Sequence, residues 1–358
     1  MKKILYLAGS RADFGPVYNL LSKMNSSSSI QLKVLFCELN VLKKVESPWY
    51  TSVKQEFDYD EISVPLNGEQ RQEIVDASIP ILSAIKNTIN QFSPDQLLIL
   101  GDRFEQFLFS FAGFSLGIPI YHIHGGEISG SVDDYYRRAI SNFSSIHFVS
   151  CVEAGDNIKR FLNISDETIY VTGAPGLETV KEFYCRSQHV EKEDICLISY
   201  HPDVKNINFI NDDLRSITKA IKYKFKKIVW ILGNSDPGSA LVFDIVYALK
   251  KQIGSKLEIY EHLEREQYLM MMLKSKVFIG NSSSGIIESA TIKIPFVNIG
   301  TRQNGRFQND STFNWKTGSK LNLTQVITLA INYNKSWDNI YYKEGSSSRI
   351  LQHLIKSN

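Results

Sequence analysis

The chain of 358 residues is too long for one ordinary hydrophobic core and suits two domains of roughly 150 to 200 residues each. Its 40 basic and 38 acidic residues give a formal net charge of +2, so no overall charge would hold it on nucleic acid or on an anionic membrane. Its four cysteines form no CxxC pair, and no run approaches the roughly 18 apolar residues that span a bilayer. We expect a soluble, cytoplasmic protein without a metal or cofactor.

Short, continuous apolar runs alternate with helical patterns along the first half of the chain. The runs predicted as strands cover residues 4–7, 32–36, 96–100, 118–122, 146–149 and 168–171. The patterns predicted as helices cover residues 69–91, 104–116 and 153–162. Continuous apolar runs are typical of parallel strands that are covered on both faces. The sequence therefore predicts a doubly wound α/β domain, and its first apolar run is too short for a signal peptide.

A second series of apolar runs repeats this pattern. The runs predicted as strands cover residues 195–199, 227–232, 256–260, 276–279 and 295–299. We expect an N-terminal Rossmann-like domain over 1–172, a linker over 173–193 with a helix at 177–184, and a C-terminal domain over 194–358. The last helix, 347–356, could pack on either domain. In such α/β folds ligands bind at the carboxyl ends of the strands, here in a cleft that both domains face.

Two polar segments follow strands of the first domain. Residues 9–15 lead from the first strand into a helix, where Arg11 is well placed for a phosphate. This segment lacks the full GxGxxG spacing, and a plain turn is the alternative. Residues 101–105, Gly-Asp-Arg-Phe-Glu, follow a later strand. Asp102 is either a functional carboxylate or the N-cap of the next helix.

The densest polar cluster covers residues 121–138, with two histidines, three carboxylates, two arginines and three glycines. Carboxylates and histidines in a water-poor cleft can transfer protons at carbon, so Glu127 and His124 are candidates for acid and base chemistry. Asp133 and Arg137 lie four residues apart on a predicted helix and would share a face. The alternative interpretation is a metal ion bound by both His122 and His124. Because side chains alternate along a strand, however, these two histidines would point to opposite faces of the sheet.

The second domain offers a phosphate site. Residues 278–290 combine a strand, a Gly/Ser-rich turn with Ser282 and Ser283, and a helix N-terminus, which together favour an anion. No lysine follows, so a Walker A loop is not indicated. Glu288 falls in the first turn of that helix, where it suits the helix dipole and could accept the hydroxyl protons of a ribose. His201, Asn234 and Arg302 each follow other strands of this domain.

Five motifs, taken in order, resemble the hydrolysing UDP-N-acetylglucosamine 2-epimerases, which serve the biosynthesis of sialic and related nonulosonic acids. The motifs are Gly-Ser-Arg-Ala-Asp, Gly-Asp-Arg-Phe, Gly-Gly-Glu-(x)5-Asp-Asp, Gly-Asn-Ser-Ser and Gly-Thr-Arg-Gln. The resemblance covers most of the chain. It implies two Rossmann-like domains in a glycosyltransferase-B arrangement, in a homodimer or homotetramer. It also implies removal of the C2 proton with elimination of UDP, followed by hydration to the free 2-epimeric sugar.

The resemblance assigns roles to matching positions. Asp102, Glu127 and Asp133 become candidates for acid and base chemistry, while His201 and Arg137 would help to hold substrate. The residues that would contact UDP are Arg11, Arg103, Asn234, His262, Ser282, Ser283, Glu288 and Arg302.

Two positions depart from the usual pattern of the family. His124 stands where many relatives have a glutamate, and Asn40 stands where many have a histidine. Both changes would suit a subgroup that acts on a 4-acetamido-4,6-dideoxy sugar nucleotide. The alternatives are a non-hydrolysing UDP-sugar 2-epimerase, a glycosyltransferase of similar two-domain shape, and a non-catalytic UDP-sugar-binding protein.

Overall fold

The computed structural model describes residues 1–9, 11–40, 52, 54–65, 71–130, 132–203, 208–232 and 238–356. The chain divides into two compact units. The first comprises Met1–Ile128, Val132–Thr179 and Tyr341–Asn358, and the second comprises Ser129–Ser131 and Val180–Ile340. The end of the chain thus returns to the first unit.

The first unit is built on a seven-stranded, all-parallel sheet in the order β3-β2-β1-β4-β5-β6-β7. Its strands are β1 (Lys2–Ala8), β2 (Ile30–Asn40), β3 (Asp58–Pro65), β4 (Gln96–Leu100), β5 (Ile120–Ile123), β6 (Ile146–Val149) and β7 (Ile169–Val171). Its main helices are α1 (Arg11–Phe14), α2 (Tyr18–Asn25), α4 (Arg71–Phe92), α5 (Phe104–Ser115), α6 (Asp133–Phe143), α7 (Val152–Leu162) and α15 (Ser346–Lys356).

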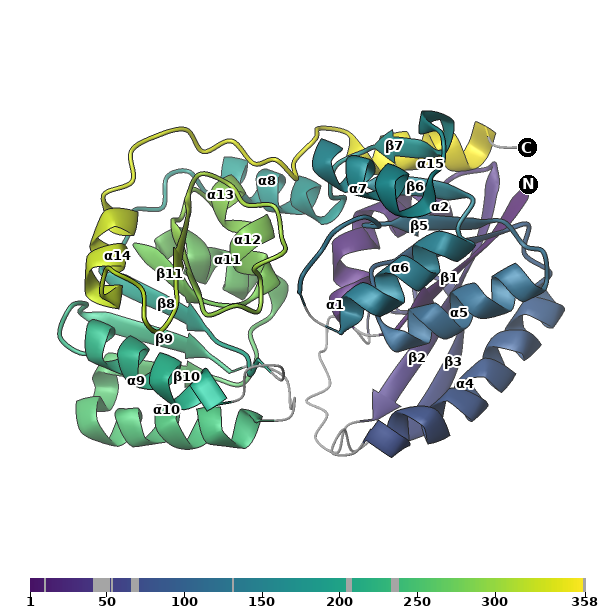
Figure 1. Cartoon of the computed structure of the whole chain (residues 1–358). Coiled ribbons are helices and arrows are strands. Elements are labelled where there is room, and N and C mark those ends of the chain that lie inside the picture. The colour runs from purple at the N-terminus through teal and green to yellow at the C-terminus, as the bar shows by residue number, and fades with distance from the viewer. Residues whose placement is uncertain are drawn as a thin grey trace. The chain divides into compact units, whose positions relative to one another are not determined.

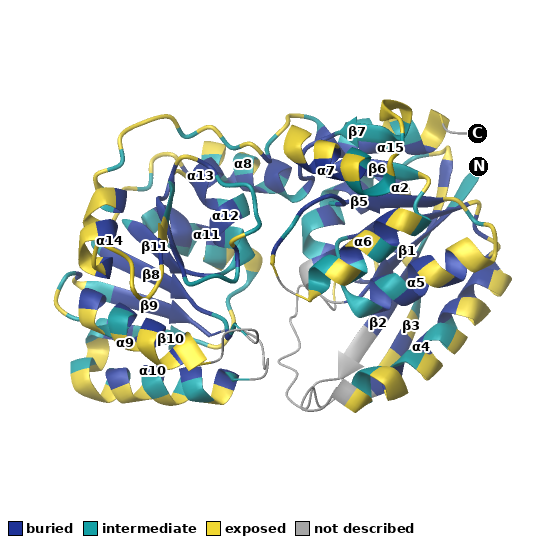
Figure 2. Ribbon diagram, viewed as in Figure 1, coloured by how far each residue is buried: buried dark blue, intermediate teal, exposed yellow. Residues whose placement is uncertain are grey.

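Two apolar layers cover the faces of this sheet. One layer joins side chains of α2 and α15 to Tyr6, Leu98 and Phe148. The other joins side chains of α4, α5 and α6 to Leu5 and Ile99. Neighbouring residues of a strand thus enter opposite layers, as a parallel sheet buried on both faces requires. Figure 2 shows β1 and β5 as mostly buried and the outer sides of the helices as exposed.

The second unit repeats this topology with a six-stranded parallel sheet in the order β10-β9-β8-β11-β12-β13. Its strands are β8 (Ile195–Ser199), β9 (Lys227–Ile231), β10 (Leu257–Tyr260), β11 (Val277–Gly280), β12 (Phe296–Ile299) and β13 (Thr312–Trp315). Its helices are α9 (Ile210–Ile221), α10 (Ser239–Ile253), α11 (Arg265–Lys274), α12 (Ser283–Ile287), α13 (Ser289–Ile292) and α14 (Leu323–Ile331), and α8 (Gly176–Arg186) spans the division between the units. Figure 1 shows one sheet in each unit with helices on both of its faces.

The predicted fold class of two Rossmann-like α/β domains is confirmed. In both sheets the strand order reverses beside the first strand, at β1–β4 and at β8–β11, which is where doubly wound folds place their ligands. Each predicted strand overlaps an observed one, but β3 and β13 were not predicted. None of the described helices is both long enough and apolar enough to cross a membrane.

Candidate active site

Asp102 and Arg137 form the centre of a buried polar cluster at the carboxyl ends of β4 and β5. Arg103, not Asp102, occupies the N-cap position of α5, so the reading of Asp102 as an N-cap is wrong. The Asp102 carboxylate instead accepts a hydrogen bond from Nη2 of Arg137. Nη1 of Arg137 donates to Asp134 at 2.5 Å and to the carbonyl oxygen of Glu127 at 2.8 Å. Arg137 is only 2% exposed, and its guanidinium fixes two carboxylates and one loop at once.

The Glu127 carboxylate joins the loop after β5 to the end of β6. Its Oε1 lies 2.7 Å from Nδ1 of His124 and accepts a hydrogen bond from the Ser150 hydroxyl at 2.8 Å. Glu127 and Ser150 are both buried. The structure therefore brings His124 and Glu127 into direct contact, as an imidazole beside a carboxylate.

His122 has a different surrounding from His124. Its Nε2 lies 2.8 Å from the carbonyl oxygen of Gly101 and its Nδ1 lies 3.1 Å from the Ser141 hydroxyl. Burial lowers the pKa of His122 to about 3, so its ring is neutral near pH 7 and braces two loops. Within the described residues, no group of three or more His, Cys, Asp or Glu side chains could hold a metal ion.

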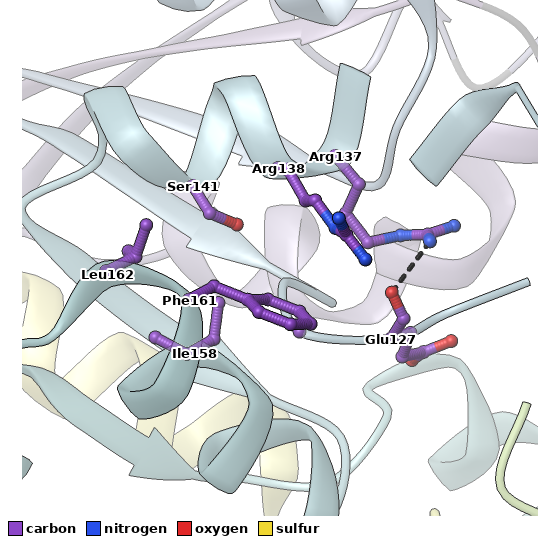
Figure 3. Close-up of a pocket in the computed structure, with 8 residues that line it drawn as sticks. Glu127, Arg137, Arg138, Ser141, Ile158, Phe161 and Leu162 are labelled. Carbon is purple, nitrogen blue, oxygen red and sulfur yellow. Dashed lines mark hydrogen bonds between the residues drawn. The ribbon is translucent and has the colours of Figure 1, made fainter. Parts of the chain in front are cut away.

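A small cavity lies behind Glu127, against α6 and α7. It has a volume of about 10 Å³, which is room for about one water molecule and far too little for a sugar. Figure 3 shows the Arg137 guanidinium directed toward Glu127, with Phe161 and Ile158 of α7 on the opposite wall. This cavity belongs to the packing behind the site and is no substrate pocket.

Arg103 lies among carboxylates. Its Nε donates to Glu105 and lies 3.6 Å from Asp13. The charge of Glu105, followed by that of Asp13 and then that of Asp133, raises the pKa of the Arg103 guanidinium, so this group is cationic. Asp133 begins α6 and is half-buried. Glu105 is fully buried and was missed as a site residue, although it directly follows the Gly-Asp-Arg-Phe motif.

In the second unit, Gly280 ends β11 at a point where only glycine fits. It has φ +148°, and a Cβ there would lie 1.8 Å from the carbonyl oxygen of Ser199 on β8. The next residue, Asn281, accepts a hydrogen bond from the backbone N–H of His201 and donates one to its carbonyl oxygen, both at 2.7 Å. The close approach of the two strands thus joins the loops that follow them.

Arg302 and Gln303 lie in the loop after β12 and join it to the loops after β8 and β11. Both side chains donate to the carbonyl oxygen of Asn281 at 2.9 Å. Burial, and then the charge of Arg302, lowers the pKa of His201 to about 3, so the His201 ring is neutral near pH 7. The loops after β8, β11 and β12 therefore form one network at the carboxyl edge of the second sheet.

Ser282 and Ser283 stand at the start of α12, as predicted from their place after β11. Ser282 is the N-cap residue, and its hydroxyl lies 3.0 Å from that of Ser284. The predicted position of Glu288 in the first helical turn is wrong. Helix α12 ends at Ile287, so Glu288 occupies its C-cap, where Arg265 donates to it at 2.9 Å. Glu288 is also the N-cap residue of the short helix α13, where a carboxylate suits the helix dipole.

Four further residues were named from the sequence, namely His262, Arg11, Asn40 and Asn234. His262 has its Nε2 3.5 Å from Oε1 of Glu264. Arg11 begins α1 and Asn40 ends β2, but their side chains lie outside the described residues, as does the whole of Asn234.

The chain is similar along its length to known sugar-nucleotide enzymes. The family model of UDP-N-acetylglucosamine 2-epimerase matches residues 24–355. A UDP-N,N'-diacetylbacillosamine 2-epimerase (hydrolyzing) of Legionella pneumophila is 30% identical over 100% of this chain and 96% of its own length. A GDP/UDP-N,N'-diacetylbacillosamine 2-epimerase (hydrolyzing) of Campylobacter jejuni is 26% identical over 86% of this chain and 82% of its own length.

A solved structure shares the fold. The UDP-GlcNAc 2-epimerase of Methanocaldococcus jannaschii, in complex with UDP-GlcNAc and UDP, superposes with a TM-score of 0.80 at 16% identity and covers 100% of both chains. The family match and the 30% identical relative each extend over more than nine-tenths of the chain. The chain belongs to the UDP-N-acetylglucosamine 2-epimerase family.

Proposed function

We propose that the protein is a hydrolysing 2-epimerase, which converts a UDP-2-acetamido sugar into UDP and the free sugar with inverted configuration at C2. The observation that carries this proposal is the contact of His124 with the buried Glu127, 2.7 Å apart, within a chain of this family. Proton removal from carbon needs a positioned base, and an imidazole held by a carboxylate is one. Asp102 and Asp133 are the further candidates for acid or base chemistry.

The reaction has two stages. In the first, a base takes the C2 proton, the C–H electrons form a C1=C2 double bond, and UDP leaves with the electrons of the C1–O bond. In the second, water adds to this 2-acetamidoglucal, placing hydroxyl on C1 and a proton on the opposite face of C2. An acid and a base on suitable sides of the sugar are therefore needed, and the cluster of the first unit contains both kinds of group.

The second unit is proposed to bind UDP. Ser282, Ser283 and the start of α12 offer hydroxyl and N–H donors to phosphate, and Arg302 offers a cation. The neutral ring of His201 joins them, because Asn281 ties its loop to that of Arg302. Asn234, Glu288 and His262 complete the contacts proposed for the second unit, and the family resemblance makes Arg11 and Arg103 further candidates for contact with UDP.

The favoured substrate is a UDP-2,4-diacetamido-2,4,6-trideoxy sugar. Both relatives described above carry diacetylbacillosamine in their names, and the Legionella protein covers this whole chain. His124 in place of a glutamate also supports a subgroup with its own sugar preference. UDP-N-acetylglucosamine is the alternative substrate.

An incubation in D2O followed by NMR tests the function. Each of the two UDP-sugars is added to purified protein, and we expect free UDP with a free manno-configured sugar that carries deuterium at C2. Retained UDP-sugar with deuterium at C2 would indicate a non-hydrolysing epimerase. UDP release without deuterium at C2 would indicate glycosyl transfer or simple hydrolysis. Unaltered spectra with saturable UDP binding would reduce the protein to a binding module.

A homodimer or homotetramer is part of the proposal. Phe111 and Phe114 are exposed on the outer side of α5, close to exposed Leu116, and such apolar surface on an outer helix is typical of a contact with another chain. Light scattering should give a multimer, and Phe114→Glu should shift it to monomer. Val152→Glu, which changes an exposed residue of α7, is the control. The proposed location is the cytoplasm, in keeping with four free cysteines.

A further inference from the structure

We propose that His124 is the base that removes the C2 proton and that Glu127 is a positioning residue that fixes the protonation of its ring. This role rests on the proposed 2-epimerase function. The family resemblance, in contrast, makes Glu127 itself a candidate acid or base.

The hydrogen bonds of Glu127 determine which ring nitrogen of His124 carries a proton. Oε1 of Glu127 lies 2.7 Å from Nδ1 of His124 and 2.8 Å from the Ser150 hydroxyl. An ionised carboxylate only accepts hydrogen bonds, so both neighbours must donate to it. Nδ1 of His124 therefore carries the proton. Nε2 is left with a lone pair that can take a proton from substrate.

The side chains of Glu127 and His124 differ in how deeply they are buried, and this difference suits them to different roles. The Glu127 side chain is 3% exposed, whereas that of His124 is 15% exposed. Arg137 fixes the backbone of Glu127 by donating to its carbonyl oxygen at 2.8 Å. A buried carboxylate that already contacts two neighbours is suited to orient a ring, and the more accessible ring is suited to meet a substrate.

The backbone around His124 adopts a conformation that this contact requires. His124 has φ +66°, a left-handed conformation that a residue with a side chain rarely adopts. Gly126 follows at φ +79°, where a Cβ would lie 2.0 Å from the carbonyl oxygen of Ala154. Asn157 holds this turn by donating to the Gly126 carbonyl oxygen at 2.9 Å. The turn brings the ring of His124 back onto Glu127, and strain of this kind concentrates at functional sites.

Removal of the C2 proton and elimination of UDP need no reagent other than the His124 ring and the substrate. Nε2 of neutral His124 takes the C2 proton and the ring becomes an imidazolium. The C2–H electrons form the C1=C2 bond, and UDP leaves with the electrons of the C1–O bond. The adjacent negative charge of Glu127 stabilises the imidazolium. The ring then releases its proton to water, which restores the base.

Nitrogen NMR of histidine-labelled protein tests the pairing independently of activity. Spectra are recorded at about pH 8, where ordinary histidines with a pKa of about 6.5 are neutral, and the His124 signals are assigned with His124→Asn. We expect the ring proton of His124 on Nδ1, and a mixture of both tautomers in Glu127→Gln. A proton found only on Nε2 in the unaltered protein would overturn the assignment.

Proton exchange tests the role of His124 as a base. His124→Asn keeps a residue type that tolerates positive φ, so we expect it to fold and to bind UDP like the unaltered protein. Its rates of C2 deuterium incorporation and of UDP release should both fall by about 10²–10⁴-fold. His189→Asn, which changes an exposed histidine of the second unit, should leave both rates unchanged. Unaltered exchange in a folded His124→Asn variant would overturn the base role.

The two experiments separate this inference from the function on which it rests. An active enzyme whose His124→Asn variant keeps full activity would contradict the base role alone. A protein that acts on neither UDP-sugar would contradict the 2-epimerase function and the base role with it, even where NMR finds the proton on Nδ1. Combining Glu127→Gln with His124→Asn should cost no more activity than His124→Asn alone, because a positioning residue acts only through its partner. Fully additive losses would overturn the positioning role of Glu127.

Discussion

Asn281 is bound to the backbone of His201 in both directions, with its side-chain oxygen accepting from the N–H and its side-chain nitrogen donating to the C=O, each at 2.7 Å. Its own carbonyl oxygen accepts from Arg302 and Gln303. One buried carboxamide therefore sets the positions of three loops that we propose to contact UDP. The proposed UDP site depends on a residue that is itself only 1% exposed.

Asn281→Asp tests this dependence. A carboxylate cannot donate to the His201 carbonyl oxygen, so two acceptors would face each other in a buried place, at a cost of about 1–3 kcal/mol. We expect lower thermal stability and UDP affinity about tenfold weaker by calorimetry. Asn211→Asp, which makes the same change at an exposed position of α9, should leave both unchanged. Equal UDP affinity in the Asn281 variant and the unaltered protein would contradict the role of this carboxamide.

Most of the fold was predictable because its strands are buried on both faces. The continuous apolar runs of β4, β6 and β8 were predicted with the bounds that the structure has. The two missed strands lie at sheet edges. In β3 only Ile62 and Val64 are buried among the residues whose burial is described, and the acidic residues Asp58, Asp60 and Glu61 precede them, so no continuous apolar run was present.

The site was predictable where polar residues cluster in the sequence and unpredictable where the fold brings them together. The density of polar groups in residues 121–138 pointed to Glu127, but its contact with Ser150 depends on the packing of β6 beside β5. Glu288 was misplaced because the helix was expected to begin after the Gly/Ser-rich turn, whereas α12 begins within that turn, at Ser283, and ends at Ile287. Helix bounds of this size cannot be read from apolar periodicity.

Arg137→Lys tests the cluster around Asp102. A lysine keeps the charge but cannot reach two carboxylates and a carbonyl oxygen at once. We expect a loss of about 1–3 kcal/mol in the free energy of unfolding, measured by urea denaturation, and a large loss of kcat. Arg138→Lys, at the next position on the exposed side of α6, is the matched control and should cost about 0.5 kcal/mol or less. Similar effects in both variants would contradict the proposed importance of the hydrogen bonds of Arg137.

Gly280→Ala tests the close approach of β11 to β8. The new Cβ would overlap the carbonyl oxygen of Ser199, and we expect a loss of about 3 kcal/mol or more in the free energy of unfolding. Gly318→Ala is the matched control, because its φ is +86° but no atom lies within 4 Å of the new Cβ. Backbone strain alone should cost this control about 1–2 kcal/mol. The difference between the two variants measures the close approach, and equal losses would mean that backbone conformation accounts for everything.

His147 on β6 makes the protein sensitive to acid. Its ring is buried and, within the described residues, neither ring nitrogen has a hydrogen-bond partner. Burial lowers the pKa of His147 to about 4, so the unfolded chain binds a proton between about pH 4 and pH 6.5 that the folded chain does not bind. Stability is therefore complete above pH 6.5 and falls as the pH drops toward 4. At pH 5 this one residue should account for a loss of about 2 kcal/mol.

His147→Leu should remove this loss. We expect a free energy of unfolding about 1 kcal/mol higher at pH 7.5, because a buried polar group without partners is replaced by an apolar one. The decrease in stability between pH 7.5 and pH 5 should shrink by about 2 kcal/mol in urea denaturation. Phe148→Leu, at the next buried position of β6, should lower stability at both pH values by the same amount. If the decrease stays as large in His147→Leu as in the unaltered protein, the acid sensitivity comes from His122 and His201, whose pKa values burial also lowers to about 3.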